Sequence, residues 1–565
     1  MRILSFFIAF ILTACQEPQK TESANKSRIG LLTENAMVVT ARPEASNIGL
    51  SILRKGGNAF DAMVATELAL AVAYPYAGNI GGGGFMVYRT NEGKTGAFDY
   101  REKAPIKADR NMYLDENGKI IPGKSTIGGM AIGVPGTIAG IFAVHKKLGS
   151  LPMEELFEPA INLANTGVII TKSQERTLNN ARESIIKTSG KNTLFSKAYK
   201  EGDTLKRNAF AQTLSRIKDN GRDEFYNGKT AKKMVEFLQE NGSIINLKDL
   251  EKYQAKERKP VEFTYKDLNI ISMSPPSSGG ICMGQILKSI EPYDIKSYGH
   301  NSLKSIQLIT EASRRSYADR SYFLGDPDFV DIPVDSLLDD AYLSQRMEDF
   351  TFEKATPSSE VDHGDMTMNY ESNETTHYSI VDSSGNAVSV TTTLNGAYGS
   401  KLYSDELGFF FNNEMNDFSS KPGEPNMFGL IGAEANRIEP EKRMLSSMTP
   451  TIVEKDGNLS MVVGTPGGSR IITSVLQCIL NVYEFDMSMK EAANAPRFHH
   501  QWLPDEIFFE KGFSDTLRNQ LKQKGYSISD REARIFGSIN AILVQDDGSL
   551  QAGAENSRDN TARGF

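Results

Sequence analysis

The character of the sequence changes abruptly near residue 375, and this change constrains the fold more than any other feature. From about residue 133 to 350 the pattern is mainly helical, whereas residues 361–374 are polar and show no apolar periodicity. Short β-rich segments then follow, at 376–380, 387–393, 409–411, 450–454 and 459–464. Helices in the first part and strands in the second predict an α+β or layered α/β body.

Small and apolar residues recur at helical spacing over about 40–73, after a strand, and predict a long helical region. A glycine run at 81–84 precedes a strand predicted at 85–88. Because no Gly-Lys-Ser/Thr sequence follows and no helix opens there, a phosphate-binding loop is disfavoured. Close approach of backbone segments explains the glycines better. Two later helices are predicted at about 470–483 and 488–493.

The first fifteen residues are typical of an export signal. Arg2 gives a positive start, and the apolar run at 3–12 is too short to span a bilayer of about 30 Å. The sequence from Leu12 to Cys15 resembles a bacterial lipobox, which implies lipidation of Cys15; the alternative is an ordinary secretory signal in which this cysteine is incidental. We therefore predict a signal peptide at 1–14, a flexible tether at 15–30, and an exported lipoprotein held by a lipid anchor at the periplasmic face of a membrane, with the outer membrane favoured, or in the periplasm.

Charge and cysteine content exclude several classes of function. The 63 basic and 71 acidic residues give a net charge of −8 and are dispersed, which argues against a nucleic-acid partner. With only Cys15, Cys282 and Cys478, the chain builds neither a disulfide framework nor a cysteine zinc site. Cys282 and Cys478 lie in apolar, helix-like stretches and are predicted to be buried, and the sequence leaves a bridge between them open. No metal or other cofactor is predicted.

The polar segment meets the first predicted strand at Glu374-Thr375-Thr376. A backbone cut before Thr375 would give this residue both a hydroxyl and a free α-amine, whose pKa of about 7.7–8.0 lets it act as a base near neutral pH. A hydroxyl beside such an amine is an activated nucleophile that needs no histidine. Strand propensity alone also explains two threonines here, so the junction by itself does not decide.

A series of motifs along the whole mature chain resembles the γ-glutamyltransferase (γ-glutamyltranspeptidase) family of N-terminal-nucleophile hydrolases. The motifs occur in order and at compatible spacing, at 78–86, 99–102, 275–280, 318–320, 375–379, 393–395, 416–419, 445–448, 464–469 and 494–502. The resemblance implies an α/β fold, a four-layer αββα sandwich, made by an autoprocessed heterodimer. The large subunit would comprise residues 31–374 and the small subunit residues 375–565.

The family's chemistry is placed on matching positions of this chain. Thr375 would first attack the carbonyl of Glu374 and split the chain. It would then attack the γ-carbonyl of a substrate such as glutathione, and water or the amine of an amino acid or dipeptide would resolve the γ-glutamyl ester. Gly467 and Gly468 would donate backbone N–H groups to the oxyanion, and Thr393 would orient the nucleophile. Seen alone, these residues are also explained as turn glycines and a strand threonine.

A γ-glutamyl group carries a free carboxylate and a free ammonium, so its pocket must present both signs of charge. The resemblance assigns the carboxylate to Arg101, Ser446 and Ser447, and the ammonium to Asn395, Glu414 and Asp417. An alternative for Arg101 is a structural ion pair with Glu102 or Asp99. Arg497 and the pair His499-His500 are expected to be structural, since no metal-binding HExxH pattern accompanies them.

One position departs from the pattern of the bacterial relatives. The segment 418–443 resembles a lid loop over the pocket, and Phe428 stands where close relatives have a tyrosine whose hydroxyl reaches the asparagine matching Asn395. Phe428 can cover the pocket but cannot make that hydrogen bond. We therefore expect a looser gate and a shifted balance between hydrolysis and transfer.

Two other functions compete with this interpretation. A related acylase that removes glutaryl-type groups from β-lactam side chains would keep the nucleophile but needs no ammonium site, and Glu414 with Asp417 favours the γ-glutamyl substrate. An enzymatically silent surface lipoprotein would use the fold only as a binding module. The joint presence of Thr375, Thr393, Arg101, Asp417, Gly467 and Gly468 argues against that alternative.

Overall fold

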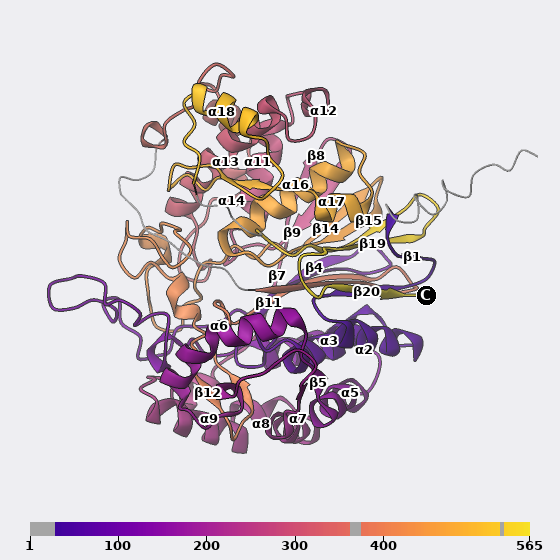
Figure 1. Cartoon of the computed structure of the whole chain (residues 1–565), viewed down its shortest axis with the longest axis vertical. Coiled ribbons are helices and arrows are strands. Elements are labelled where there is room, and N and C mark those ends of the chain that lie inside the picture. Colours follow the sequence, from indigo (N-terminus) through magenta and orange to yellow (C-terminus); the bar gives the residue numbers. More distant parts are fainter. Residues whose placement is uncertain (1–28, 362–374, 531–535) are drawn as a thin grey trace, which may run out of the picture.

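Two antiparallel sheets form the centre of the computed structural model, which describes residues 29–361, 375–530 and 536–565 (Figure 1). In the described residues each sheet has seven strands. The first, called the β10 sheet, runs in the order β20 (Thr561–Gly564), β2 (Met37–Thr40), β10 (Thr376–Val381), β11 (Ala387–Thr393), β3 (Gly83–Arg89), β4 (Thr95–Asp99) and β7 (Lys256–Arg258). The second, called the β14 sheet, runs in the order β1 (Leu32–Thr33), β19 (Leu550–Ala554), β18 (Asn540–Val544), β15 (Asn458–Val463), β14 (Thr451–Lys455), β9 (Leu268–Ser272) and β8 (Val261–Tyr265).

Helices cover the outer face of each sheet and complete four layers (Figure 1). The β10 sheet is covered by α2 (Pro43–Arg54), α3 (Ala59–Ala73) and α4 (Thr137–Leu148), with α5 (Met153–Thr166), α6 (Lys172–Ser189), α7 (Asn208–Asn220), α8 (Arg222–Tyr226) and α9 (Lys229–Glu240) outside them. The β14 sheet is covered by α11 (Gly279–Ile290), α13 (Leu303–Phe323), α16 (Ile471–Tyr483) and α17 (Met489–Asn494), with α15 (Asp340–Arg346) and α18 (Asp515–Gln523) beyond them.

Both sheets contain strands from before and after residue 375. In the β10 sheet, β10 and β11 lie between β2 and β3, and in the β14 sheet β14 pairs with β9. A chain cut before Thr375 would therefore leave two pieces that share both sheets. Two hydrophobic clusters hold them together, one between the β10 sheet and its helices and one between the two sheets and under the helices of the β14 sheet, and each cluster contains residues from both sides of position 375.

The helical region predicted at 40–73 is two helices rather than one. Gly56 adopts a φ of +93°, which ends α2, and the Asn58 side chain then opens α3 through a capping box with Asp61. All fifteen residues of α3 are buried, because this helix lies between the β10 sheet and outer helices such as α5. The expectation of a mainly helical stretch at 133–350 was wrong over 256–272, where β7, β8 and β9 join the sheets.

The glycine run is explained by backbone crowding, as predicted. A Cβ atom on Gly82 would lie 2.1 Å from the carbonyl oxygen of Thr393, and one on Gly81 would lie 2.2 Å from that of Phe410. Cys282 and Cys478 are buried and not bridged, which confirms their interpretation as small core residues.

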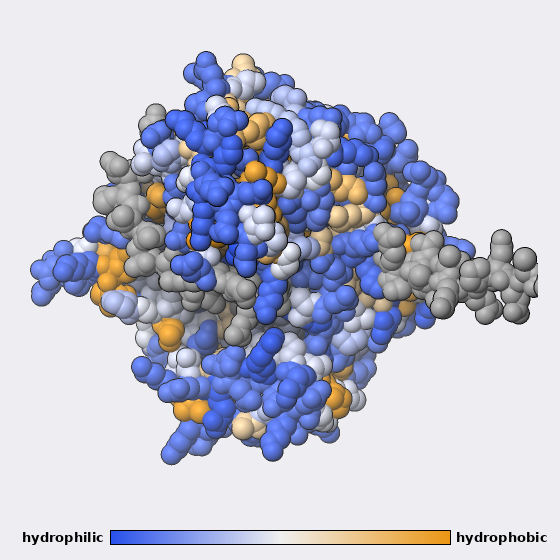
Figure 2. All heavy atoms as spheres, turned by 45° about the horizontal axis from the view of Figure 1, so that its top comes forward, coloured by the Kyte–Doolittle hydropathy of each residue, from blue (hydrophilic) through white to orange (hydrophobic). Residues whose placement is uncertain are grey.

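The surface shown in Figure 2 is mostly hydrophilic, with small and separate hydrophobic patches. Within the described ranges we find no helix with the length and hydropathy needed to cross a membrane. The predicted signal peptide, most of the tether, Cys15 and Glu374 lie outside the described residues.

Candidate active site

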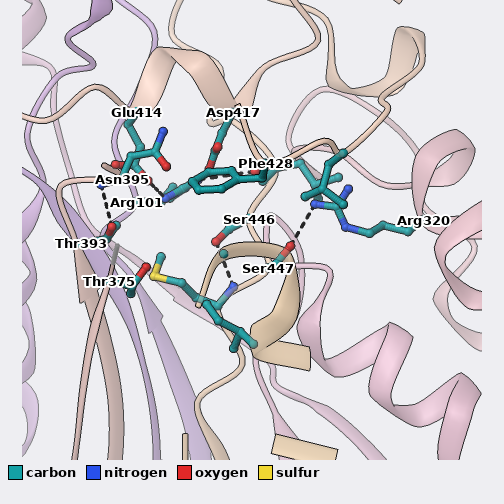
Figure 3. A pocket seen from close by; sticks show the side chains of 15 residues that line it. Arg101, Arg320, Thr375, Thr393, Asn395, Glu414, Asp417, Phe428, Ser446 and Ser447 are labelled. Carbon is teal, nitrogen blue, oxygen red and sulfur yellow. Dashed lines mark hydrogen bonds and ion pairs between the residues drawn. The ribbon is translucent and has the colours of Figure 1, made fainter. Parts of the chain in front are cut away.

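Thr375 immediately precedes β10, at the centre of the β10 sheet. Thr376 pairs with Thr392 across the antiparallel ladder between β10 and β11, and continuing this register places Thr375 opposite Thr393. Thr375 is 5% exposed and lines a pocket at this end of the sheet (Figure 3). Thus the sheet register brings the predicted nucleophile and its predicted orienting threonine together.

The pocket collects most of the residues predicted from the sequence. Its lining contains nine of the ten catalytic and substrate-binding candidates, all except Gly467, together with Phe428 of the predicted lid and five residues that carried no predicted site role. The lining residues are Arg101, Arg320, Thr375, Thr393, Asn395, Glu414, Asp417, Phe428, Leu430, Leu445, Ser446, Ser447, Met448, Gly468 and Ile471.

The end of β11 is fixed by hydrogen bonds to its backbone and side chain. The Thr393 hydroxyl accepts from the backbone N–H of Asn395 at 2.7 Å, and the Asn395 side chain donates to the carbonyl of Asn413 at 3.0 Å. On the other side, Asn79 donates to the carbonyl of Thr393 at 2.7 Å and accepts from the N–H of Gly82 at 2.8 Å. These contacts hold Thr393 in one orientation beside Thr375.

The glycine turn after β15 needs backbone angles that other residues avoid. Gly467 has a φ of +147° and Gly468 a φ of +56°. A Cβ atom on Gly467 would lie 2.3 Å from the carbonyl oxygen of Phe536. The turn leads into α16 and is held from α13, where the Tyr317 hydroxyl donates to the carbonyl of Ser469 at 2.5 Å. Gly468 of this turn lines the pocket.

Arg101 lies at the centre of a buried cluster of acids. It is 1% exposed, forms an ion pair with Glu414, and contacts Asp417 at 2.5 Å and Glu102 at 4.0 Å. Burial raises the pKa of Glu414 well above its ordinary value, with Arg101 opposing this, and raises the pKa of Glu102 to about 8. Burial likewise raises the pKa of Asp417. Arg101, predicted to bind the substrate carboxylate, thus pairs with Glu414 and Asp417, which were predicted to bind the substrate ammonium.

The alternative partners weighed for Arg101 have smaller roles. Glu102 lies at the limit of ion-pair distance, and the Asp99 carboxylate pairs with Arg258 at 2.9 Å and Arg443 at 3.2 Å. Asp99 accepts only the backbone N–H of Arg101, at 3.0 Å. The guanidinium group of Arg101 therefore belongs to the pocket.

The two predicted serines directly follow Leu445, whose carbonyl accepts from Arg101 at 3.4 Å, and Ser447 contacts a cation without a predicted role. The Ser446 hydroxyl accepts from the N–H of Met448 at 3.1 Å, and the Ser447 hydroxyl accepts from Arg320 at 3.2 Å. Arg320 belongs to the motif at 318–320, but nothing in the sequence indicates that its side chain reaches the pocket.

The segment 418–443 covers part of this pocket and contributes Phe428 and Leu430 to its lining (Figure 3). Gln501 holds the segment from outside the pocket, because its side-chain amide donates to the carbonyls of Phe428 and Gly429 at 3.3 and 3.2 Å. The phenyl ring of Phe428 has no group that could hydrogen-bond to Asn395.

Arg497 and the two neighbouring histidines make contacts outside the pocket. Arg497 forms buried ion pairs with Glu510 at 3.1 Å and Glu555 at 2.9 Å. Burial lowers the pKa of His499 to about 3, so its ring is neutral. These contacts agree with the structural role expected from the sequence.

An αββα sandwich in which a threonine begins a central strand, beside a glycine turn and a charged pocket, defines an N-terminal-nucleophile hydrolase. The comparisons with known proteins then give the family. The chain belongs to the γ-glutamyltranspeptidase family, whose model matches residues 45–565. The predicted family and the predicted fold class are confirmed.

Three relatives illustrate this similarity. The glutathione hydrolase proenzyme of Escherichia coli (strain K12) is 45% identical over 534 residues, which cover 92% of this chain and 90% of the relative. The crystal structure of Helicobacter pylori γ-glutamyltranspeptidase is 44% identical, with a TM-score of 0.57, and covers 60% of this chain and 96% of that one. A cephalosporin acylase from Bacillus halodurans has a TM-score of 0.84 at 22% identity over 99% of both chains, and shows the fold alone.

Proposed function

We propose that this chain is a proenzyme that cuts itself before Thr375 and then hydrolyses or transfers γ-glutamyl groups, with glutathione among its donors. The observation that carries this proposal is the register of β10 and β11, which brings Thr375 opposite Thr393 in a pocket with both signs of charge. The proposed products are a large subunit ending at 374 and a small subunit of residues 375–565.

In the self-cleavage step, the Thr375 oxygen attacks the carbonyl carbon of residue 374. The peptide C–N bond breaks as a C–O bond forms, and the leaving nitrogen takes the proton to become the free α-amine of Thr375. Water then hydrolyses the ester and releases the large subunit with a terminal carboxylate. The new amine supplies the base that the hydroxyl needs for later turnovers.

In each turnover, the amine takes the proton from the Thr375 hydroxyl as the oxygen attacks the γ-carbonyl of the donor. The backbone N–H groups of Gly467 and Gly468 would stabilise the oxyanion, and loss of one such donor typically costs about 10²–10³-fold in rate. The leaving amine departs with the proton, and a γ-glutamyl ester remains on Thr375. Attack by water completes hydrolysis, and attack by an amino acid or dipeptide completes transfer.

When the donor binds, ion pairs with its carboxylate and ammonium would replace the ion pairs that Arg101 makes with Glu414 and Asp417 in the free pocket. The substrate carboxylate would take the place of acids at Arg101, next to Ser446 and Ser447. Glu414 and Asp417, released from Arg101, would then pair with the substrate ammonium together with Asn395. Because both ends must bind for the charges to balance, a zwitterionic γ-glutamyl group fits better than a glutaryl group, which has no ammonium.

A gel and an activity assay test this proposal. Purified protein should give two bands on a denaturing gel, and Thr375→Ala should give one. The wild type should release p-nitroaniline from γ-glutamyl-p-nitroanilide, faster with glycylglycine as acceptor, and should prefer this donor to glutaryl-p-nitroanilide. A processed protein that turns over only the glutaryl donor would be an acylase, and one that turns over neither would be a binding module.

We also propose that the protein is exported and anchored by a lipid on Cys15, at the periplasmic face of a membrane. The support is the charge at Arg2, the short apolar run at 3–12 and the Leu-Thr-Ala-Cys sequence ending at Cys15. Labelled palmitate should be incorporated into the wild-type protein and not into Cys15→Ser. Equal labelling of both, or secretion of an unlabelled wild type, would favour an ordinary signal peptide.

A further inference from the structure

Arg320 is a buried cation in the wall of the pocket, on α13. Its side chain lines the same pocket as Thr375, and the residue is 4% exposed (Figure 3). Its Nε donates to the Ser278 hydroxyl at 2.9 Å and its Nη2 donates to the Ser447 hydroxyl at 3.2 Å. The Ser278 hydroxyl in turn donates to the carbonyl of Ser446 at 2.7 Å. Arg320 thus fixes both serines of the predicted carboxylate site.

The contact with Arg320 determines how the Ser447 hydroxyl can donate and accept hydrogen bonds. A guanidinium only donates, so the Ser447 oxygen must accept, and its one proton is left for another partner. The Ser446 oxygen likewise accepts from the N–H of Met448. Two O–H donors in one wall suit an anion such as a carboxylate, and the charge on Arg320 strengthens the Ser447 donor.

The charge of Arg320 is compensated less directly than that of Arg101. Arg101 pairs with Glu414 and Asp417, whereas no carboxylate oxygen of the described residues lies within 4.0 Å of a nitrogen of Arg320. A buried cation without a carboxylate at ion-pair distance is stabilised by an anion that enters the pocket.

We propose that Arg320 is a specificity-determining residue that selects donors with an α-carboxylate, through the Ser447 hydroxyl and through its own charge. The inference rests on the proposed function, because it concerns how that pocket recognises its donor. It adds a second cation to the carboxylate site predicted at Arg101, Ser446 and Ser447.

Three donors that differ by one charged group test this role. γ-Glutamyl-p-nitroanilide carries both groups, 4-aminobutyryl-p-nitroanilide lacks the carboxylate, and glutaryl-p-nitroanilide lacks the ammonium. Arg320→Gln should raise KM about 10- to 100-fold for the two donors with a carboxylate, the usual effect of losing a hydrogen bond to a charged group. The kcat for these two donors should stay within about threefold, because the lost contact stabilises the bound substrate and the transition state equally. All constants for the 4-aminobutyryl donor should also stay within about threefold, because this donor has no carboxylate.

Matched variants separate this role from damage to the fold. Arg320→Lys keeps the charge without the two-point geometry and should show a smaller loss, again confined to donors with a carboxylate. Lys304→Gln removes an exposed cation from the same helix, outside the pocket, and should leave kcat and KM unchanged for all three donors. Ser447→Ala combined with Arg320→Gln should lose less than the sum of the two single losses, because the residues act through one contact.

An equal loss on all three donors, in Arg320→Gln and in Arg320→Lys, would overturn the proposal, and so would an unchanged KM for γ-glutamyl-p-nitroanilide. If the 4-aminobutyryl donor is too slow to follow, competitive inhibition constants for L-glutamate and 4-aminobutyrate give the same comparison. A wild type that turns over only the glutaryl donor would refute the proposed function, and the glutaryl KM of Arg320→Gln would still decide the role of Arg320.

Discussion

Thr375 lies opposite Thr393, one position beyond the Thr376–Thr392 pair of the ladder between β10 and β11. Residues directly opposite in an antiparallel pair have their side chains on the same face of the sheet. The hydroxyl of Thr393 is held by the N–H of Asn395 at 2.7 Å. The strand register therefore sets the position of the nucleophile before any substrate is bound.

Thr393→Val should slow both self-cleavage and turnover by about 10- to 100-fold, since it leaves the shape of the residue but removes a hydroxyl that orients the nucleophile. Time courses on denaturing gels measure the first effect and kcat the second. Thr393→Ser keeps the hydroxyl and should retain most of both rates. Self-cleavage of the valine variant at the wild-type rate would show that Thr393 has no part in positioning Thr375.

Gly467→Ala should lower kcat by about 10²–10³-fold, because a methyl group 2.3 Å from the carbonyl oxygen of Phe536 must displace the turn that carries the proposed oxyanion donors. The matched control is Gly457→Ala, in the turn between β14 and β15, where φ is +74° and nothing lies within 4 Å of the new methyl group. It should cost about 1 kcal/mol of stability and leave kcat unchanged. Equal kcat values for the two variants would remove the glycine turn from catalysis.

Phe428→Tyr should lower the ratio of hydrolysis to transfer by about 2- to 10-fold, the effect expected of one added hydrogen bond that holds the lid over the acyl-enzyme. The ratio is measured from free glutamate and from γ-glutamylglycylglycine formed in the same reaction. Phe428→Leu keeps an apolar cover without a hydroxyl and should not lower the ratio. An unchanged ratio in the tyrosine variant would mean that the lid does not control access of water.

Glu67 on α3 gives a prediction about stability. It is fully buried and accepts a hydrogen bond from the Tyr378 hydroxyl at 2.6 Å, and burial raises its pKa from 4.5 to about 7. The folded state therefore keeps a proton that the unfolded state has lost, so stability falls as the pH rises from about 4.5 to 7. The penalty above pH 7 is about 3 kcal/mol.

Glu67→Gln imitates the protonated form, so it should be more stable than its parent at pH 8, by up to about 3 kcal/mol, and only slightly so at pH 5. Urea unfolding of both proteins at the two pH values, in the single-chain Thr375→Ala background, measures the difference. Glu236→Gln changes an exposed acid on α9 and should show no such pH dependence. A difference that is larger at pH 5 would contradict the assigned protonation state.

The sequence predicted those elements whose pattern is local. The strands at 376–380 and 387–393 and the helix at 470–483 lie where strand propensity and apolar spacing placed them. Strands β8 and β9 were missed, and their place in the β14 sheet depends on long-range pairing, because β9 pairs with β14 and β8 pairs with β9.

The site was predictable only in part, since its partners are distant in the sequence. Motif resemblance supplied Arg101, Glu414 and Asp417, but their ion pairs join positions more than 300 residues apart and follow from the packing of the layers. Arg320 belongs to the motif at 318–320, but its place in the pocket has no local signal, because only the placement of α13 brings its side chain to Ser447. The burial of Glu67 could not be predicted either, because it follows from the packing of other elements around all sides of α3.

The central claim is that Thr375 becomes a chain end that carries its own base. N-terminal sequencing of the smaller subunit from purified, active protein tests it most directly. The expected sequence is Thr-Thr-His-Tyr-Ser, starting at Thr375. Active protein that lacks this N-terminus, and still releases glutamate from glutathione, would contradict the account.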